Sequence, residues 1–215
     1  MRIGIFGGTF DPVHYGHLRP AEAVRQQLKL DELWLMPNRI PPHKAAASAT
    51  VEQRLQMLAL AQQEFPAFSI CDIELKRDVP SYSVVTLEQL ISTRPQDNFY
   101  FIMGTDSLVT LSTWHQWQQL FALCHLVICG RDGWQLTQDN PVWPQWQRRH
   151  ISGEQHLQQH ATVRSGDIVQ LDIELQPYAS TQLRHALEVG DINACQQAVP
   201  AAVLDFILQQ QLYQS

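Results

Sequence analysis

Apolar runs and amphipathic stretches alternate along most of the chain. Short runs rich in β-branched, aromatic and other apolar residues predict the buried strands of a parallel sheet. These runs occupy residues 2–6, 32–36, 68–73, 98–103, 125–129 and 167–171. Elsewhere apolar residues recur every three or four positions, which predicts amphipathic helices. The expected helices cover residues 17–30, 51–63, 84–91, 182–189 and 201–213.

This alternation predicts an α/β fold, a single doubly wound parallel sheet with helices on both faces. We expect one domain over residues 1–215. In the helix at 51–63, the apolar face is expected to consist of Val51, Leu55, Leu58 and Ala59. Ligands of such sheets bind beyond the carboxyl ends of the strands, where the strand order reverses. Functional residues are therefore expected just after the strands.

Residues 134–161 interrupt the alternation, because they are rich in Gln and Trp. We interpret them as a surface insertion of helices and loops that covers one edge of the sheet. His150, His156 and His160 are dispersed through this segment without an accompanying cluster of cysteines or carboxylates. They are expected to be solvated rather than bound to a metal.

Composition excludes several classes of function. The longest apolar runs are far too short to span a membrane, and the first residues enter a strand at once, so no signal peptide is expected. The four cysteines lack C-x-x-C spacing, which indicates reduced core thiols of a cytoplasmic protein. A net charge of −6 argues against extended contact with a nucleic-acid backbone, but small phosphorylated ligands remain possible.

The most informative segment follows the first predicted strand. Residues 3–18 read IGIFGGTFDPVHYGHL and lead from a strand through a glycine turn into a helix. Gly7 and Gly8 lack a Cβ atom, so the backbone there can adopt a positive φ and let an anion approach main-chain N–H groups. Those groups and the start of the helix form a candidate phosphate site. His14 and His17 share one helix face and can reach the same ligand.

Other interpretations of this segment fit less well. Its glycines do not match G-x-G-x-x-G, and the chain contains no Gly-Lys-Ser or Gly-Lys-Thr of a Walker loop. The H-x-x-H pair lacks the glutamate and the spacing of an H-E-x-x-H zinc site. A turn shaped only by Asp11, Pro12 and Gly16 is an alternative, but it gives the two histidines no role.

A second anion site is indicated near the carboxyl end, where residues 179–184 read ASTQLR. Ser180 or Thr181 is a natural N-cap for the following helix, whose end Gly190 marks. These hydroxyls, the helix N-terminus and Arg184 can bind phosphate together. An ordinary capped helix with a solvated arginine is the alternative. Because the chain carries two such segments, we favour a triphosphate held between them.

Two further segments follow predicted strands. The prolines of the loop at 37–44 restrict the backbone, so Asn38 and Lys44 would lose little conformational entropy on binding a ligand. A purely structural connection is an equally good explanation of this loop. Gly104 permits close approach of a ligand. Asp106, at an expected helix start, can accept ribose hydroxyls or act as a plain N-cap.

Together these segments resemble the nucleotidylyltransferase superfamily, and closely the bacterial nicotinate-nucleotide adenylyltransferases. The resemblance rests on GGTFDPVHYGH at 7–17, the P-P-H-K loop, Gly104, Asp106, Thr113, Trp114, Ser180, Thr181 and Arg184. The family usually has a serine where this chain has Ala179. The resemblance implies a Rossmann-like nucleotidylyltransferase fold. It also implies transfer of the adenylyl group of ATP to nicotinate mononucleotide, in NAD biosynthesis.

The resemblance further implies roles for single residues. His14, His17 and Arg184 would be catalytic, and Mg²⁺ would arrive with ATP rather than bind protein side chains. Trp114 would stack on the pyridine ring, and the end of the strand at 125–129 would lie near the adenine. ATP would contact Gly7, Gly8, Thr9, Phe10, Lys44, Gly104, Asp106, Arg131, Ser180 and Thr181. The mononucleotide would contact Asn38, Tyr82, Ser83, Trp114 and His115.

Several alternatives stay open at this point. The chain could prefer the amidated mononucleotide, since replacing a carboxylate oxygen by NH₂ turns an acceptor into a donor. It could be a catalytically silent nucleotide sensor, for which Ala179 is the supporting position. A phosphopantetheine adenylyltransferase fits less well, because such enzymes are shorter and lack the P-P-H-K and T-W segments. A pure protein-interaction domain would leave both phosphate motifs without a purpose. The expected ligands are ATP and nicotinate mononucleotide, with no nucleic acid or membrane as partner.

Overall fold

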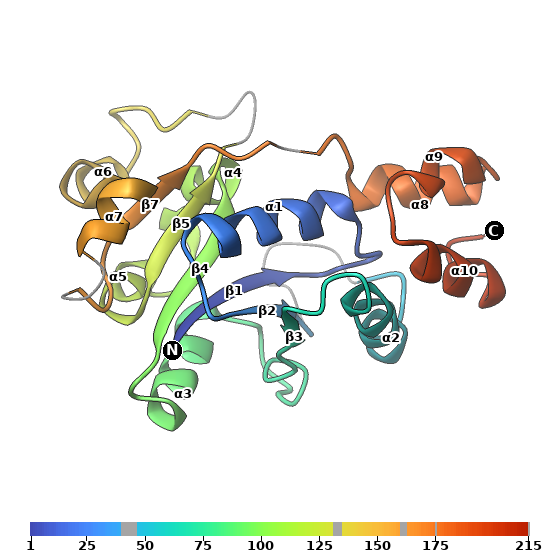
Figure 1. The fold of residues 1–215 in the computed structure, drawn as a ribbon, viewed down its shortest axis with the longest axis horizontal. Coiled ribbons are helices and arrows are strands. Elements are labelled where there is room, and N and C mark those ends of the chain that lie inside the picture. Colours follow the sequence, from blue (N-terminus) through green and yellow to red (C-terminus); the bar gives the residue numbers. More distant parts are fainter. Residues whose placement is uncertain (40–46, 131–134, 160–162, 175, 215) are drawn as a thin grey trace.

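The strands form a single parallel sheet in a computed structural model that describes residues 1–39, 47–130, 135–159, 163–174 and 176–214. In the described residues the sheet has seven strands in the order β3-β2-β1-β4-β5-β7-β6 (Figure 1). The strands are β1 (Arg2–Gly8), β2 (Glu32–Pro37), β3 (Phe68–Ile70), β4 (Asn98–Gly104), β5 (His125–Cys129), β6 (His150–Ser152) and β7 (Ile168–Leu171). The predicted doubly wound parallel sheet is confirmed. The strand order reverses at β1 and β4, so a ligand is expected beyond their carboxyl ends.

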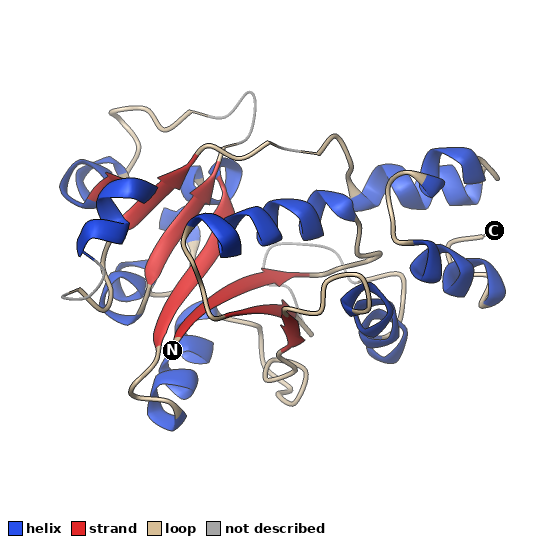
Figure 2. Ribbon diagram, in the orientation of Figure 1, coloured by secondary structure: helices blue, strands red, loops and turns tan. Residues whose placement is uncertain are grey.

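Helices cover both faces of the sheet (Figure 2). The longer ones are α1 (Tyr15–Gln27), α2 (Val51–Gln62), α3 (Ser83–Thr93), α8 (Ser180–Glu188) and α10 (Ala201–Gln209). The shorter ones are α4 (Thr105–Val109), α5 (Leu120–Leu123), α6 (Trp143–Arg149), α7 (Gly153–Gln159) and α9 (Ile192–Gln196), with 3₁₀ turns at Leu111–Thr113 and Trp117–Gln119. The five predicted helices are therefore present, with ends shifted by up to four residues. Such shifts are ordinary where caps rather than periodicity decide the boundary.

Side chains on successive strand residues point to opposite faces, which produces two hydrophobic cores. On β2, Leu33 and Leu35 pack into the core that contains residues of α1, α2, α8 and α10. The intervening Trp34 and Met36 pack into the core that contains residues of α3 and α5. The near-continuous apolar character of β2 follows from burial on both faces.

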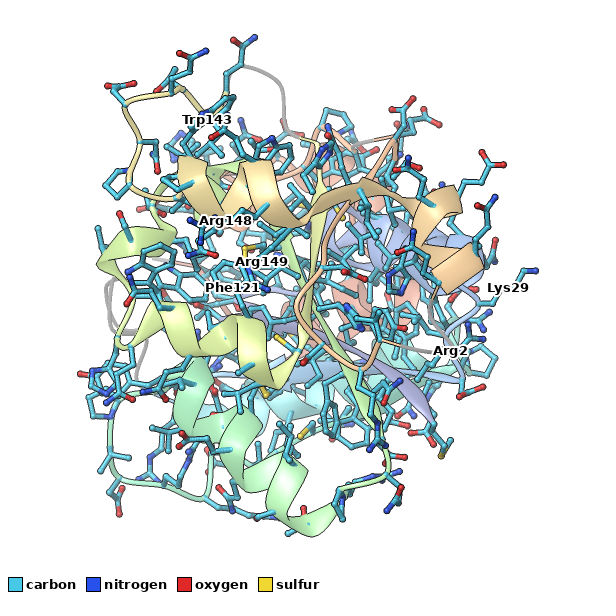
Figure 3. All side chains as sticks on the ribbon, turned by 90° about the vertical axis from the view of Figure 1, so that its left-hand side faces the viewer. Arg2, Lys29, Phe121, Trp143, Arg148 and Arg149 are labelled. Atoms are coloured by element: carbon cyan, nitrogen blue, oxygen red, sulfur yellow. The ribbon has the colours of Figure 1, made fainter. Side chains whose placement is uncertain are left out.

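The segment after β5 departs from expectation. We expected only surface helices and loops at 134–161, but His150–Ser152 forms β6, a parallel strand paired with β7 at the edge of the sheet. Its pattern is too short and too polar to be recognised as a strand. Figure 3 shows Arg149, at the end of α6, close to Phe121 of α5. The guanidinium lies 4.8 Å from the ring centroid and donates to the Gly166 carbonyl oxygen, which attaches this segment to the core.

His156 corrects a second expectation. It is only 1% exposed, and its ring contacts Asp167 and the Tyr100 hydroxyl instead of solvent. His150 is exposed as predicted, and His160 lies outside the described residues. The burial of His156 could not be predicted from its Gln-rich segment, because its carboxylate partner Asp167 lies outside that segment, eleven positions later.

The buried face of α2 also differs from the expected one. Arg54, Met57, Leu58 and Ala61 are buried, whereas Ala59 is exposed. The buried face of α2 is therefore rotated about the helix axis relative to the predicted apolar face, because the buried face includes Arg54. Arginine is almost never fully buried unless it is paired, so periodicity of apolar residues could not find it.

The carboxyl-terminal helices lie beside the start of α1 (Figure 1). The Tyr15 N–H, in the first turn of α1, donates to the Ala198 carbonyl oxygen at 2.7 Å. This arrangement brings the carboxyl-terminal helices to the carboxyl end of β1. Within the described ranges, no helix is long and apolar enough to cross a bilayer.

Candidate active site

The loop after β1 is built differently from the expected glycine turn. Gly7 and Gly8 belong to β1, and the positive φ falls instead on Phe10, at 51°. The expectation of a positive φ at either glycine is therefore wrong. A Cβ on Gly8 would lie 3.1 Å from the Phe10 ring, tighter than most real Cβ contacts, so the ring packs closely over this glycine. Phe10 is 1% exposed, and this burial holds an uncommon backbone conformation in place.

The two histidines lie together at the start of α1. His14 is the N-cap residue and His17 lies in the first turn. Their rings stack with centroids 3.7 Å apart and planes inclined by 26°, which confirms that they share one face. The Phe10 ring meets His17 edge-on at 5.2 Å, so the loop and the helix fix the position of this imidazole. A helix N-terminus carries a partial positive charge, which favours an anion beside this pair.

Gly16 explains how the pair can sit so close to another part of the chain. A Cβ at this position would come within 2.7 Å of both His14 Nδ1 and the Tyr178 carbonyl oxygen. Real Cβ atoms do not make such contacts, so only glycine fits there. The first turn of α1 therefore packs directly against the segment that precedes α8.

The two predicted phosphate motifs are in direct contact. The Ser180 hydroxyl donates to the Pro12 carbonyl oxygen at 3.0 Å, and Arg184 Nη1 donates to the Asp11 carbonyl oxygen at 2.6 Å. Arg184 Nη1 also lies 3.9 Å from an Asp11 carboxylate oxygen, and its side chain is 30% exposed. Residues separated by more than 160 positions thus build one site, which supports the prediction that the motifs act together.

The start of α8 corrects the expected capping. The helix begins at Ser180, and its N-cap residue is Ala179, which makes no side-chain capping bond. Neither Ser180 nor Thr181 is the cap, because the Ser180 hydroxyl bonds to the loop after β1 and Thr181 lies exposed in the first turn. The predicted end at Gly190 is right, since this glycine has a φ of 78° just after the helix.

Asp11 has a larger structural role than a turn residue. Its carboxylate accepts the N–H groups of Ser48 at 2.7 Å and Ala49 at 3.1 Å, and the Tyr213 hydroxyl at 2.7 Å. Burial raises the pKa of Tyr213, and its hydrogen bond to the Asp11 carboxylate raises it further. The carboxylate therefore joins the loop after β1 to the residues before α2 and to the end of the chain. Sequence reasoning missed Tyr213, because a tyrosine near a terminus carries no local signal of such a bond.

Arg54 is a second residue that sequence reasoning missed. Its side chain is 2% exposed, and Nη1 donates to the Thr9 carbonyl oxygen at 2.8 Å and to the Asn38 carbonyl oxygen at 2.9 Å. Burial lowers the pKa of Arg54, while the nearby charge of Asp11 opposes this shift. The buried guanidinium holds the loops after β1 and β2 together. This contact places Asn38 beside the loop after β1.

The end of β4 carries the third group of predicted residues. Gly104 is the N-cap residue of α4 and Asp106 lies in its first turn, so the alternative of Asp106 as N-cap is wrong. Trp114 is partly buried, with its indole edge-on to Phe101 at 6.1 Å. His115 is exposed and stacks on Tyr82 at 4.5 Å, which brings two predicted mononucleotide contacts together. Ser83 follows Tyr82 as the first residue of α3.

A cavity of about 640 Å³ borders Gly130, directly after β5. Its wall also includes His150, Gly153 and Leu171, from the edge strands and the start of α7. It therefore lies at the end of β5, where the adenine was expected. Lys44 and Arg131, predicted to contact the phosphates, lie outside the described residues.

The chain is similar to a family of nucleotide-transferring proteins. Residues 5–186 match the model of a family described as cytidylyltransferase-like. A protein named "Probable nicotinate-nucleotide adenylyltransferase" from Shewanella sediminis is 49% identical, covering 100% of this chain and 99% of the relative. A relative of the same name from Shewanella pealeana is 48% identical, covering 99% and 96%.

Solved structures share the fold. The structure described as Plasmodium falciparum nicotinic acid mononucleotide adenylyltransferase complexed with NaAD has a TM-score of 0.75 at 18% identity, covering 99% of this chain and 97% of that one. The same enzyme complexed with APC has a TM-score of 0.74 at 19% identity, covering 99% and 96%. At 18% and 19% sequence identity, these similarities show that the fold is shared and nothing more.

Proposed function

Since the chain belongs to the cytidylyltransferase-like family and, within it, to the nicotinate-nucleotide adenylyltransferases, we propose that it transfers the adenylyl group of ATP to nicotinate mononucleotide. The products are nicotinate adenine dinucleotide and pyrophosphate. The observation that carries this proposal is the contact of Ser180 and Arg184 with the loop that leads into the His14 and His17 pair. Two anion-binding segments meeting at one strand end suit a triphosphate better than a smaller anion.

The reaction needs little covalent chemistry from the protein. The 5′-phosphate of the mononucleotide is ionised at neutral pH, so it attacks the α-phosphorus of ATP without a general base. The new P–O bond forms as the bond between the α-phosphorus and the bridging oxygen breaks, and pyrophosphate leaves with the electron pair. The task of the protein is to align two polyanions and to neutralise charge that grows on the phosphates.

The residues of the site have the chemistry for this task. His14 and His17 donate to oxygens of the α- and β-phosphates, and Arg184 holds the outer phosphates with Lys44. Main-chain groups of Gly7, Gly8, Thr9 and Phe10 line the ATP site, and Ser180 and Thr181 complete it from α8. Preorganised donors of this kind act most strongly where charge develops in the transition state.

Mg²⁺ enters this site as part of its substrate. Among the described residues, the nitrogen-bearing side chains proposed to contact the triphosphate are two imidazoles and a guanidinium, which bind phosphate oxygens rather than a hard cation. The Asp11 carboxylate accepts three hydrogen bonds from the protein itself. Mg²⁺ bound to ATP therefore supplies charge neutralisation along the triphosphate, and the protein binds the complex.

The opposite side of the site recognises the nucleosides. Asp106 accepts ribose hydroxyls beside Gly104, and the end of β5 binds the adenine. Arg131, which lies outside the described residues, is assigned to the phosphates of ATP. Trp114 stacks on the pyridine ring, while Asn38, Tyr82, Ser83 and His115 line the mononucleotide. The main-chain N–H of Ser83, at the start of α3, favours the nicotinate carboxylate over the amide, because it donates and cannot accept. We place the reaction in the cytoplasm, which agrees with the four cysteines being free thiols.

The test is a pyrophosphate-release assay on the purified chain with MgATP. We expect turnover with nicotinate mononucleotide and a lower kcat/KM with the amidated mononucleotide. A higher kcat/KM for the amide would overturn the substrate assignment but not the adenylyl transfer. Absence of pyrophosphate with both substrates, from a folded chain that binds ATP, would identify a silent nucleotide sensor. The variant Arg148→Ala, which removes an exposed side chain of α6, serves as the control and should match the wild type.

A further inference from the structure

A second pair of histidines lies at the opposite end of the sheet. His125 opens β5, and Asp167 directly precedes β7, so both lie at the amino ends of parallel strands. His156 of α7 and Tyr100 of β4 complete the group. Adenylyl transfer takes place beyond the carboxyl ends of the strands and uses none of these four side chains.

The two imidazoles converge on one carboxylate oxygen. His156 Nδ1 lies 2.7 Å and His125 Nδ1 lies 3.3 Å from Asp167 Oδ2. The candidate ligand atoms of the three residues all lie within 4.8 Å of one another. The histidine side chains are 1% and 0% exposed, whereas that of Asp167 is 18% exposed. The cluster is thus buried on its nitrogen side and open to water only at the carboxylate.

The surroundings support a ligand set rather than an ordinary hydrogen-bonded core. Nδ1 of both imidazoles lies near the same carboxylate oxygen, and His125 Nδ1 accepts the main-chain N–H of Asp167 at 3.3 Å, so its lone pair already points toward Asp167. The other ring nitrogen of His156, Nε2, lies 3.1 Å from the Tyr100 hydroxyl, and metal-bound histidines typically have such a partner behind the ligand atom. Nε2 of His125 is buried without a hydrogen-bond partner among the described residues.

We propose that His125, His156 and Asp167 form a binding site for one divalent transition-metal ion of the zinc class. Two imidazole nitrogens and one carboxylate oxygen suit Zn²⁺ or Co²⁺ and are poor ligands for Mg²⁺ or Ca²⁺. The exposed side of Asp167 leaves the fourth position to water. Binding displaces the His156 ring proton that points toward the carboxylate, so the ion takes the place of that proton.

Such an ion would have a structural role. It would join β5, the segment before β7 and α7, which follows the edge strand β6. The contact of His125 and His156 rings, with centroids 4.6 Å apart, already brings these elements together. An ion that binds only the folded chain raises its stability, so the melting temperature reports on the site independently of adenylyl transfer.

The test uses the full chain without a polyhistidine tag, treated with a chelator and then titrated with Co²⁺ at neutral pH. We expect one equivalent of Co²⁺ to bind with the visible absorption of a tetrahedral site and to raise the melting temperature. Zn²⁺ should then bleach this absorption. No uptake of Co²⁺ by the folded wild-type chain would overturn the proposal.

Variants separate this site from other imidazoles. Asp167→Asn and His156→Gln should abolish the absorption, and Tyr100→Phe should weaken binding by about 10- to 100-fold, the usual effect of removing a partner behind a ligand. His150→Gln, an exposed histidine of the same segment, and His17→Gln, from the pair at the other end of the sheet, should leave it unchanged. Absorption that survives in Asp167→Asn and disappears in His17→Gln would overturn the assignment.

If a variant fails to fold, the site can still be tested in the wild-type chain. In that case the wild-type chain is followed by NMR of its histidine rings during titration with Zn²⁺. Shifts confined to the His125 and His156 resonances support the site. Shifts confined to other histidines, or none, contradict it.

Discussion

The described residues contain two pairs of neighbouring histidines, and the two pairs differ in what the nearby carboxylate contacts. At the carboxyl end of β1, Asp11 bonds to two main-chain N–H groups and to Tyr213, while the His14 and His17 rings stack on each other. At the amino end of β5, both imidazoles are directed at Asp167 instead. In the first pair, the Asp11 carboxylate is hydrogen-bonded to other groups, so the site favours binding of an anion. In the second pair, the Asp167 carboxylate lies beside both imidazoles, so the site favours binding of a cation.

The largest effect should follow from removing one imidazole of the anion-binding pair. His17→Ala is expected to lower kcat by about 10²- to 10³-fold, because one preorganised donor to a developing charge is lost. The pyrophosphate-release assay measures this change, and the melting temperature should stay near that of the wild type. A His17→Ala chain with nearly full turnover would show that this imidazole does not serve the reaction.

Arg184 tests whether the carboxyl-terminal motif belongs to the same site. Arg184→Ala should lower kcat by about 10²-fold, since a charged donor to the triphosphate is lost. Arg184→Lys keeps the charge but not the planar fork, so it should recover only part of the activity. Loss of folding in Arg184→Ala with wild-type activity in Arg184→Lys would instead indicate a structural arginine.

Arg54 tests how the anion-binding region is held together. Arg54→Met is expected to lower the free energy of unfolding by about 2 to 4 kcal/mol, because the Thr9 and Asn38 carbonyls lose a buried donor. Urea denaturation measures this change. The matched control is Arg148→Met, which removes an exposed arginine of α6 (Figure 3). Equal stability of the two variants would contradict the role of Arg54.

Tyr213 gives a smaller effect that depends on pH. Its pKa is raised in the folded chain by burial and by Asp11, so the neutral phenol is favoured on folding. This contribution is complete below the unfolded pKa of about 10 and is lost as pH rises above it. Tyr213→Phe should therefore cost about 1.5 kcal/mol at neutral pH and make stability fall less steeply above pH 10 or so. An unchanged alkaline slope, equal to that of Tyr178→Phe, would contradict this account.

The sequence predicted the sheet well because strand patterns are local. All six expected strands are present, and each begins within one residue of its expected start. The strand β6 was not found, because three residues at a polar edge carry no periodic signal. The expected Rossmann-like arrangement and the adenylyltransferase family are confirmed.

The candidate site was predictable only where its residues form a local motif. His14, His17 and Arg184 lie in such motifs, so their proximity could be anticipated. Arg54, Tyr213 and Asp167 act through partners that the fold brings from distant positions, and no local pattern marks such a contact. Phe10 shows a further limit, since a buried aromatic residue adopts the backbone conformation that a glycine was expected to supply.

The central claim is that the histidine pair and Arg184 bind the same triphosphate. A crystal structure of the chain with a non-hydrolysable ATP analogue tests it most directly. We predict that a ring nitrogen of His14 or His17 and the Arg184 guanidinium each lie about 3 Å from oxygens of that triphosphate. A triphosphate that contacts only one of the two motifs, or binds elsewhere on the chain, would contradict the account.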